Sequence, residues 1–375
     1  MNQWCSSHFR PEHLIVGFKL VCFALSFFSI VSVVRANEQD YLSTQLRIQD
    51  LFSKFESSVV RVKATREEVV KGKAKRLLKM GSGFFVSKDG HILTTGLLAN
   101  ADRTWIEHNK EYFLTENLGS DPLCNLTLLK TIEKPTKFNF VSFSNNQADT
   151  QVGAFLLGLT CALEFEIGPT IGLMQSQESD FGRTLFPTKM IRSSLALGPG
   201  EVGGPVFDLN GEFVGITHAA LPDLGASFIL PAKACARIRD GLILSGKVDY
   251  GWFGITVTRK LNSQNGFNIE IKSVGTNSKL KIGDILLKIG KTEISERGDI
   301  VDSTFYARPG TFVEFLINRD GKEMVIPIRV SPRPKPSNTS QQEISDTDQN
   351  QSEVSVLPSA VLNAGSSDSK KSPDQ

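Results

Sequence analysis

Short apolar segments separated by turn residues run through most of the chain. Residues 58–63 alternate apolar and polar positions, as a strand of a half-buried sheet does. Residues 81–95 contain two apolar strands joined at an Asp-Gly turn, and the same hairpin signal recurs at Asn210-Gly211 and Asp320-Gly321. Because segments with helical spacing are few, this pattern favours a mainly β protein built from packed β-barrels.

Three segments have the apolar spacing of helices. Residues 41–57 predict an amphipathic helix that covers one end of the first barrel. Residues 232–245 and 296–307 predict two further helices, the first of which links the barrels to the C-terminal part. The Lys- and Arg-rich residues 65–80 predict a solvated loop. The apolar positions of the first helix are Leu42, Leu46, Phe52 and Phe55.

The composition is that of an ordinary globular protein, with 40% hydrophobic and 22% charged residues. A length of 375 residues is sufficient for two buried cores. Residues 1–36 hold three basic residues against one acidic residue, so their removal lowers the formal charge from +2 to zero. This balance argues against a nucleic-acid or polyanion partner, and we expect neither a cofactor nor a metal.

The first 36 residues have the pattern of an export signal. A polar region with Arg10 and Lys19 precedes the apolar run Leu20–Val34, and small residues precede a cleavage point after Ala36. The alternative is an uncleaved membrane anchor, because residues 14–34 form a stretch of 21 residues that is long enough to span a bilayer. Both interpretations place the rest of the chain outside the cytoplasm, in the periplasm or cell envelope.

Two further features concern the mature chain and its end. Cys124, Cys161 and Cys235 remain after cleavage, without short metal-type spacing, and we expect them to be single buried residues without a disulfide. Residues 332–375 are rich in Ser, Gln, Asp, Asn and Pro and poor in aromatic residues. Such a segment buries too little apolar surface to offset chain entropy, which predicts a disordered tail.

An ordered set of motifs gives the chain a family resemblance. The segment from Gly200 to Pro205, Gly-Glu-Val-Gly-Gly-Pro, resembles the Gly-Asn-Ser-Gly-Gly-Pro loop that carries the nucleophile of trypsin-like enzymes. With the motifs named below, it resembles the HtrA/Deg family, which consists of exported, trypsin-like serine proteases that bear PDZ domains. The other motifs are Gly81-Ser82-Gly83-Phe84, Ile92-Leu93-Thr94, Gly119-Ser120-Asp121-Pro122 and Leu126-Thr127-Leu128-Leu129-Lys130.

The resemblance implies a domain organisation. A signal peptide over residues 1–36 and an N-terminal helical segment over 37–57 precede a double six-stranded β-barrel of the chymotrypsin fold over 58–245. One PDZ domain of the α+β class over 246–331 and the disordered tail follow.

The resemblance also identifies the three catalytic positions. Leu97 stands at the position of the general base, Asn125 at that of the orienting aspartate and Val202 at that of the serine nucleophile. Valine has no hydroxyl to attack with, and no pairing of the mature histidines with nearby serines recreates a triad. We therefore predict that the chain is not an enzyme but an inactive homologue of a trypsin-like serine endopeptidase. The residues considered for a rewired centre are His91, His108, His218, Ser193 and Ser194.

Two binding elements remain in this interpretation. The loop remnant with Gly200, Val202 and Gly203 either retains a notch for a peptide carbonyl or keeps its glycines only to build the turn. In the implied PDZ domain, the loop Trp252-Phe253-Gly254 offers N–H groups to a peptide carboxylate, and the strand edge from Ile255 through Val257 pairs with the peptide backbone. Alternatively, Phe253 and Ile255 are core residues, and the groove is degenerate because the turn over Gly275–Lys279 is short.

The predicted function is that of an exported HtrA-like pseudoprotease. It binds protein C-termini or unfolded polypeptides through its PDZ domain and acts as an adaptor, a chaperone-like factor or a regulator of active HtrA-like proteases. The resemblance to the HtrA/Deg family implies a homo-trimer. The alternatives are an active serine-type endopeptidase in protein quality control and a structural subunit of an envelope complex.

Overall fold

The structure is a computed structural model that describes residues 42–334 apart from 71–72, 97–100, 144–149, 183, 262–265 and 276–277. The predicted export signal, Leu97 and the tail from residue 335 lie outside the described residues. The chain divides into two units, residues 1–53 and 54–375. A helix over residues 42–55 confirms the helix predicted for 41–57, whereas its covering of the barrel stays a prediction.

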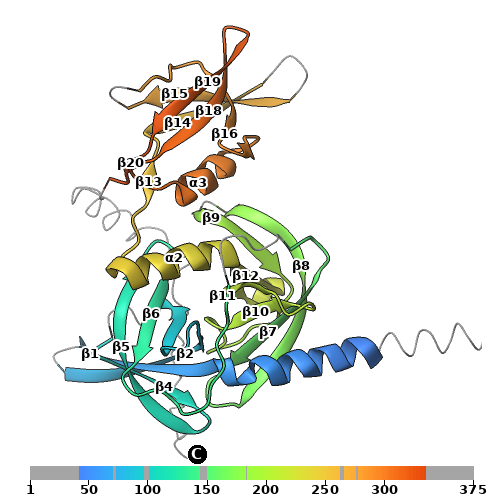
Figure 1. The fold of residues 1–375 in the computed structure, drawn as a ribbon, viewed down its shortest axis with the longest axis vertical. Coiled ribbons are helices and arrows are strands. Elements are labelled where there is room, and N and C mark those ends of the chain that lie inside the picture. The colour runs from blue at the N-terminus through green and yellow to red at the C-terminus, as the bar shows by residue number, and fades with distance from the viewer. Residues whose placement is uncertain are drawn as a thin grey trace, which may run out of the picture. The chain divides into compact units, whose positions relative to one another are not determined.

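The first barrel closes through six antiparallel strands in the order β1-β2-β3-β6-β5-β4 (Figure 1). Apolar residues that point inward from several strands form its core, among them Val62, Phe85, Ile92 and Leu129. The hairpin between β2 and β3 contains the predicted Asp-Gly turn, where Gly90 has φ +83°. The strands are β1 (Val59–Val70), β2 (Lys73–Phe85), β3 (His91–Thr95), β4 (Arg103–His108), β5 (Glu111–Asp121) and β6 (Leu126–Thr131).

The second barrel repeats this topology with the strand order β10-β11-β12-β9-β8-β7. Its core is a separate apolar cluster that includes Leu156, Ile191, Val206 and Ile229. The predicted trypsin-like double six-stranded barrel is therefore confirmed. The strands are β7 (Phe155–Cys161), β8 (Ile167–Phe181), β9 (Thr184–Ser193), β10 (Pro205–Asp208), β11 (Phe213–Leu221) and β12 (Ala226–Pro231), with the short 3-10 turns η1 (Glu56–Ser58) and η3 (Pro222–Leu224) outside the strands.

Residues 251–332, here called the C-terminal module, form a third sheet in the order β14-β15-β16-β18-β19, with β17 paired to β16. Helix α3 (Arg297–Tyr306) contributes Ile300 to the core of this module, beside Ile271 and Phe315. Helix α2 (Ala232–Ser245) precedes the module. The strands are β13 (Gly251–Trp252), β14 (Ile255–Leu261), β15 (Phe267–Val274), β16 (Ile285–Ile289), β17 (Thr292–Glu293), β18 (Phe312–Arg319), β19 (Lys322–Arg329) and β20 (Ser331–Pro332), and β13 pairs with β20.

The solvated loop predicted for residues 65–80 is wrong. β1 and β2 continue through this segment as one long antiparallel hairpin, with pairing from Val59 opposite Phe84 to Val70 opposite Lys73. Side chains of opposite charge face each other across the strands, as where Arg76 contacts Glu67 at 3.0 Å. Backbone pairing stabilises a strand whether or not its faces are apolar, so a high density of charges did not indicate a loop.

The other two predicted helices are present, and the prediction for the three cysteines is confirmed. The helices predicted for 232–245 and 296–307 are α2 and α3, each within one residue of the predicted ends. Cys124, Cys161 and Cys235 are buried and free. Among the described residues, no helix combines the length and the apolar character that crossing a membrane requires.

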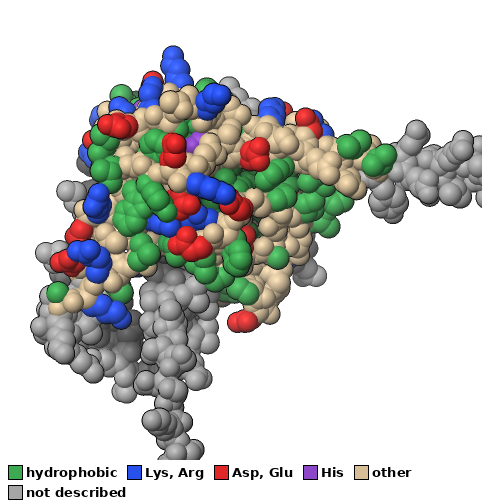
Figure 2. All heavy atoms as spheres, turned by 90° about the horizontal axis from the view of Figure 1, so that it is seen from below, with side chains coloured by type: hydrophobic (Ala, Val, Ile, Leu, Met, Phe, Trp, Pro, Cys, Tyr) green, Lys and Arg blue, Asp and Glu red, His purple; other side chains and the backbone are tan. Residues whose placement is uncertain are grey.

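Charged side chains also connect the two barrels. Arg61 and Lys63 of β1 contact Glu107 of β4 at 2.9 Å and 3.2 Å. Lys63 also contacts Glu164, in the turn between β7 and β8, at 3.1 Å, and Arg61 donates to the carbonyl of Phe165 in the same turn. On the face drawn in Figure 2, basic and acidic side chains are likewise intermixed among hydrophobic ones. The ion pairs therefore hold the β7–β8 turn against the first barrel.

Candidate functional site

The loop between β9 and β10 has the backbone that its glycines predict. Gly200 has φ +86° and Gly203 has φ +102°, a region that side chains with a Cβ rarely adopt. A Cβ on Gly200 would lie 2.6 Å from the backbone nitrogen of Leu163 and 3.0 Å from the carbonyl oxygen of Cys161. Glycine at residue 200 is therefore required both by the backbone angle and by the close approach of the β7–β8 turn.

Polar side chains brace this loop from inside the second barrel. The Glu201 carboxylate accepts hydrogen bonds from the Thr160 hydroxyl at 2.7 Å and from the Gly198 N–H at 2.5 Å. The Thr217 hydroxyl donates to the Glu201 carbonyl at 2.8 Å and accepts from the N–H groups of Gly203 and Gly204 at 3.0 Å and 2.9 Å. The loop therefore keeps its shape by contacts that do not involve the side chain of residue 202.

Ser82 of β2 joins the same loop to the first barrel. Its N–H donates to the Val202 carbonyl at 3.0 Å, and its hydroxyl donates to the Gly200 carbonyl at 2.9 Å and accepts from the Cys161 N–H at 2.8 Å. The carbonyls of Gly200 and Val202 are thereby held toward β2. Among the described residues, neither the Gly200 N–H nor the Val202 N–H has a hydrogen-bond acceptor.

Asn125 lies beside the position predicted for the general base. Leu97 is outside the described residues, but the N–H of Gly96, directly before it, donates to the Asn125 carbonyl at 2.5 Å. The Asn125 side chain also lies against Gly96, because a Cβ there would be 2.5 Å from its Oδ1. Asn125 has φ +51°, a left-handed conformation that asparagine tolerates better than most residues. The fold thus places residue 125 next to residue 96.

His218, within β11, contacts the backbone next to Asn125. From β11 its Nε2–H donates to the carbonyl of Cys124, the neighbour of Asn125, at 2.8 Å. Burial lowers the pKa of His218 below 6.5, and the hydrogen bond to Cys124 offsets only part of that shift. Burial therefore favours the neutral imidazole, and the hydrogen bond to the Cys124 carbonyl orients the ring.

The other candidates for a rewired centre are dispersed. His91 Nδ1 bonds the Ser87 hydroxyl at 2.7 Å, and His108 Nε2 donates to the Ser57 carbonyl at 2.9 Å. The hydroxyl of Ser193 bonds that of Ser227 at 2.6 Å inside the second barrel, and the Ser194 hydroxyl accepts from the Leu173 N–H at 2.9 Å. Each group is thus bonded to a different part of the fold.

The loop at the start of the C-terminal module has a second unusual glycine. Gly254 has φ +68°, and its carbonyl accepts from the Gly275 N–H at 2.7 Å. Phe253 is buried and its ring contacts that of Phe315 edge to face at 5.0 Å, so its side chain serves the core. Trp252 is 38% exposed. The loop therefore consists of a residue buried in the core, an exposed aromatic side chain and a glycine with positive φ.

Strand β14 has one unpaired edge. Among the described strands it pairs only with β15, so the N–H and C=O groups of its other edge face away from the sheet. Ile255 and Val257 are half-buried and pack against the core of the module. Such an edge next to an apolar surface can receive a further strand.

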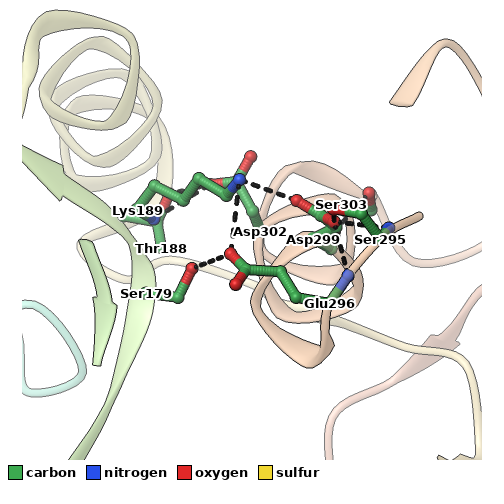
Figure 3. A network of polar contacts seen from close by, with 8 residues as sticks. All are labelled: Ser179, Thr188, Lys189, Ser295, Glu296, Asp299, Asp302 and Ser303. Carbon is green, nitrogen blue, oxygen red and sulfur yellow. Dashed lines mark hydrogen bonds and ion pairs between the residues drawn. The ribbon is translucent and has the colours of Figure 1, made fainter. Parts of the chain in front are cut away.

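Helix α3 is fixed to the second barrel by a polar network (Figure 3). Lys189 of β9 donates to the Asp299 carboxylate at 2.7 Å and lies 3.7 Å from Glu296, while the hydroxyl of Ser179 on β8 donates to Glu296 at 2.7 Å. Thr188 and the Lys189 N–H both donate to Asp302. Burial alone would raise the pKa of Asp299, but hydrogen bonds from Lys189 and backbone N–H groups hold it below its usual value.

A glycine allows the helix to approach this closely. A Cβ on Gly298 would collide with the Ser179 side chain. Neither this contact nor the ion pair of Lys189 with Asp299 was anticipated from the sequence, since the partners lie more than a hundred residues apart.

Comparisons with known proteins agree with this architecture. The trypsin-like peptidase domain family matches residues 81–216. The probable periplasmic serine endoprotease DegP-like of Bartonella henselae is 26% identical over 318 residues, which is 80% of this chain and 62% of that relative. The protein of the same name from Pseudomonas fulva is 28% identical over 282 residues, 70% of this chain and 58% of that relative.

Solved structures show the same fold. The HtrA-type protease AlgW with a decapeptide matches 77% of this chain and 99% of its own, with a TM-score of 0.61 and 21% identity. AlgW with a tripeptide gives a TM-score of 0.63 over 77% of this chain and 98% of its own, also at 21% identity.

These comparisons contradict the prediction that the chain is not an enzyme. The relatives are named serine endoproteases and the structural neighbours are HtrA-type proteases, so the comparisons point to an enzyme. The prediction rested on the side chains at Leu97, Asn125 and Val202 alone, whereas the similarity extends over most of the chain.

The extent of the match limits what the relatives imply. The chain spans about three fifths of the length of the curated relatives it matches. The motifs of the nucleophile loop, the closed double barrel and the relatives nevertheless agree with one another. The chain therefore contains a trypsin-like peptidase domain over residues 81–216 and is similar to HtrA-type serine proteases over most of its length.

Proposed function

We propose that this protein is an exported HtrA-family protein that binds polypeptides by their C-terminal ends, in the manner of a PDZ domain. The binding groove lies along β14, with the carboxylate at the loop Trp252-Phe253-Gly254. The observation that carries the proposal is the combination of a free strand edge with a glycine of positive φ at its start. Structural neighbours with bound peptides support it.

The chemistry of the groove follows from these elements. A peptide that adds to β14 satisfies the free N–H and C=O groups of the edge, while its alternate side chains contact Ile255 and Val257. The positive φ of Gly254 lets successive N–H groups of the loop converge on the peptide carboxylate. Short ligands of this kind bind with micromolar affinity, about −8 kcal/mol.

A matched pair of variants tests the loop. Gly254→Val opposes the positive φ, because a β-branched residue is strongly disfavoured there, whereas Gly254→Asn also adds a side chain but tolerates the same φ. In fluorescence polarisation with the full chain and a labelled peptide ending in valine, we expect Gly254→Asn to retain most binding and Gly254→Val to lose it. Equal affinities for the two variants would refute the assignment of the carboxylate loop.

A second candidate function is serine-type endopeptidase activity in protein quality control. The observation that favours it is that the curated relatives are named serine endoproteases. Degradation of casein that a fluorophosphonate blocks would support it, and mapping the labelled serine would identify the nucleophile, because Val202 carries no hydroxyl. Casein that stays intact, with no labelled protein, would refute this candidate.

We extend the proposal to the place where the protein acts. The relatives are named probable periplasmic endoproteases, which supports export, and we propose that the signal is cleaved after Ala36. In the periplasm, a groove for C-termini would act on unfolded polypeptides in a chaperone-like role, or on active HtrA-family proteases as an adaptor or regulator. Mass spectrometry of the protein recovered from cells tests the cleavage, since the mature chain would begin at residue 37. Light scattering tests assembly as a homo-trimer.

A further inference from the structure

Arg259 lies on the groove face of β14, at the end of the strand away from the carboxylate loop. Directly paired residues of antiparallel strands project to the same face. Val257 pairs with Ile271 and Arg259 pairs with Ile269, and both isoleucines are buried in the core of the module. Arg259 therefore continues the line that begins with Ile255 and Val257.

The guanidinium of Arg259 is exposed and held in place without a carboxylate partner. Its central carbon lies 4.3 Å from the centroid of the Phe267 ring, a cation–π contact that restricts the side chain but leaves its N–H donors available. Within the described part of the chain, no Asp or Glu forms an ion pair with it. Its neighbour Lys260 instead bonds Glu270 at 2.6 Å.

The strand register determines which residue of a bound peptide lies opposite Arg259. A peptide that places its carboxylate at Gly254 runs antiparallel to β14, so its last residue lies near Ile255. Arg259 lies four positions further along β14, about 13 Å at roughly 3.3 Å per residue. Its guanidinium therefore faces the peptide side chain about four residues before the C-terminal residue.

We propose that Arg259 is a specificity-determining residue of this groove, and that the groove selects peptides with Asp or Glu about four residues before an apolar C-terminal residue. The inference rests on the proposed function, since it names the class of peptide that the same groove takes. Opposite charges supply the selection, because an unpaired cation and a peptide carboxylate meet at the rim of an otherwise apolar surface.

The experiment measures peptide affinity by fluorescence polarisation with the full chain at low salt. Otherwise identical peptides ending in valine carry Glu, Gln or Lys at this position, and a fourth carries Glu one residue nearer the C-terminus, where the side chain projects to the opposite face. We expect the Glu peptide to bind roughly two- to fivefold tighter than the Gln peptide, the Lys peptide to bind most weakly, and the shifted Glu to confer no advantage.

Two charge reversals complete the test. Arg259→Glu should invert the order so that the Lys peptide binds best, whereas Lys260→Glu, on the other face, should leave the order unchanged. Circular dichroism checks that both variants fold, and Arg259→Gln, which should abolish the preference, replaces the reversal if that variant unfolds. A preference for Glu that survives both Arg259 variants would overturn the inference while leaving the groove intact. Failure of every peptide to bind the unaltered protein would overturn the proposed function itself.

Discussion

Replacing Gly200 by alanine tests how tightly the nucleophile loop fits against the β7–β8 turn. The substitution places a Cβ 2.6 Å from the Leu163 backbone nitrogen, at φ +86°. The matched control is Gly153→Ala, in the same barrel, where φ is +89° and no atom lies within 4 Å of the added Cβ. Both variants carry the strain of a positive φ, about 1–2 kcal/mol. Only Gly200→Ala adds a collision between backbone segments, which costs roughly 1–3 kcal/mol more.

Urea unfolding of the full chain, followed by circular dichroism, measures the two free-energy losses. We expect Gly200→Ala to destabilise the fold by about 2–5 kcal/mol and Gly153→Ala by about 1–2 kcal/mol. The difference between them isolates the close approach, because the cost of the backbone angle cancels. Equal losses would refute the reasoning and would mean that the turn yields to the added methyl group without cost.

Three further predictions concern the docking of the C-terminal module and acid stability. A double-mutant cycle of Lys189→Met and Asp299→Asn should give a measurable coupling of up to about 1 kcal/mol in thermal or urea unfolding, since Lys189 is partly exposed. No measurable coupling would show that this ion pair does not stabilise the fold. Gly298→Ala should expose the β8–β9 hairpin to limited proteolysis, whereas Gly168→Ala in β8, where φ is not positive and the added Cβ meets nothing within 4 Å, should not. The pKa of His218 is lower in the folded protein than in the unfolded chain, so the unfolded chain binds a proton first as the pH falls. The contribution of His218 to the free energy of unfolding is therefore complete above pH 6.5 and is lost as the pH drops toward the folded pKa. His218→Gln should flatten this fall, by at most about 1.4 kcal/mol per pH unit, in unfolding measured between pH 7.5 and 5.5.

The fold was accessible from the sequence where local chemistry determines local structure. Gly90, Gly211 and Gly321 were predicted at hairpin turns and have φ between +80° and +83°. The helix over residues 232–245 was also predicted, and Gly246 in a left-handed conformation ends it. In these cases one short segment carries its own signal.

The long hairpin of β1 and β2 was missed because its signal is divided between two strands. Thr65 of β1 and Leu78 of β2 are partners in a register that runs from Val59 opposite Phe84 to Val70 opposite Lys73. A charged segment read on its own lacks the pattern of a half-buried strand. Cross-strand pairing depends on both strands, so it cannot be predicted from the sequence of either strand alone.

The backbone conformation of the candidate site could be predicted from the sequence, but the side chains that hold it in place could not. The glycines at residues 200, 203 and 254 indicated where the chain turns tightly. The side chains that brace those turns come from distant parts of the sequence, as Thr160 does for Glu201 and Ser82 for Gly200. Hydrogen bonds between such partners depend on the closed barrels, so they become visible only in the fold.

The central claim is that the groove along β14 recognises the carboxylate of a polypeptide C-terminus. Isothermal titration of the full chain with one apolar peptide, as the free acid and as the C-terminal amide, tests it most directly. We predict micromolar binding of the acid and at least tenfold weaker binding of the amide, because an amide carries no charge for the N–H groups of the loop at Gly254. Equal affinity for the two forms would contradict the claim.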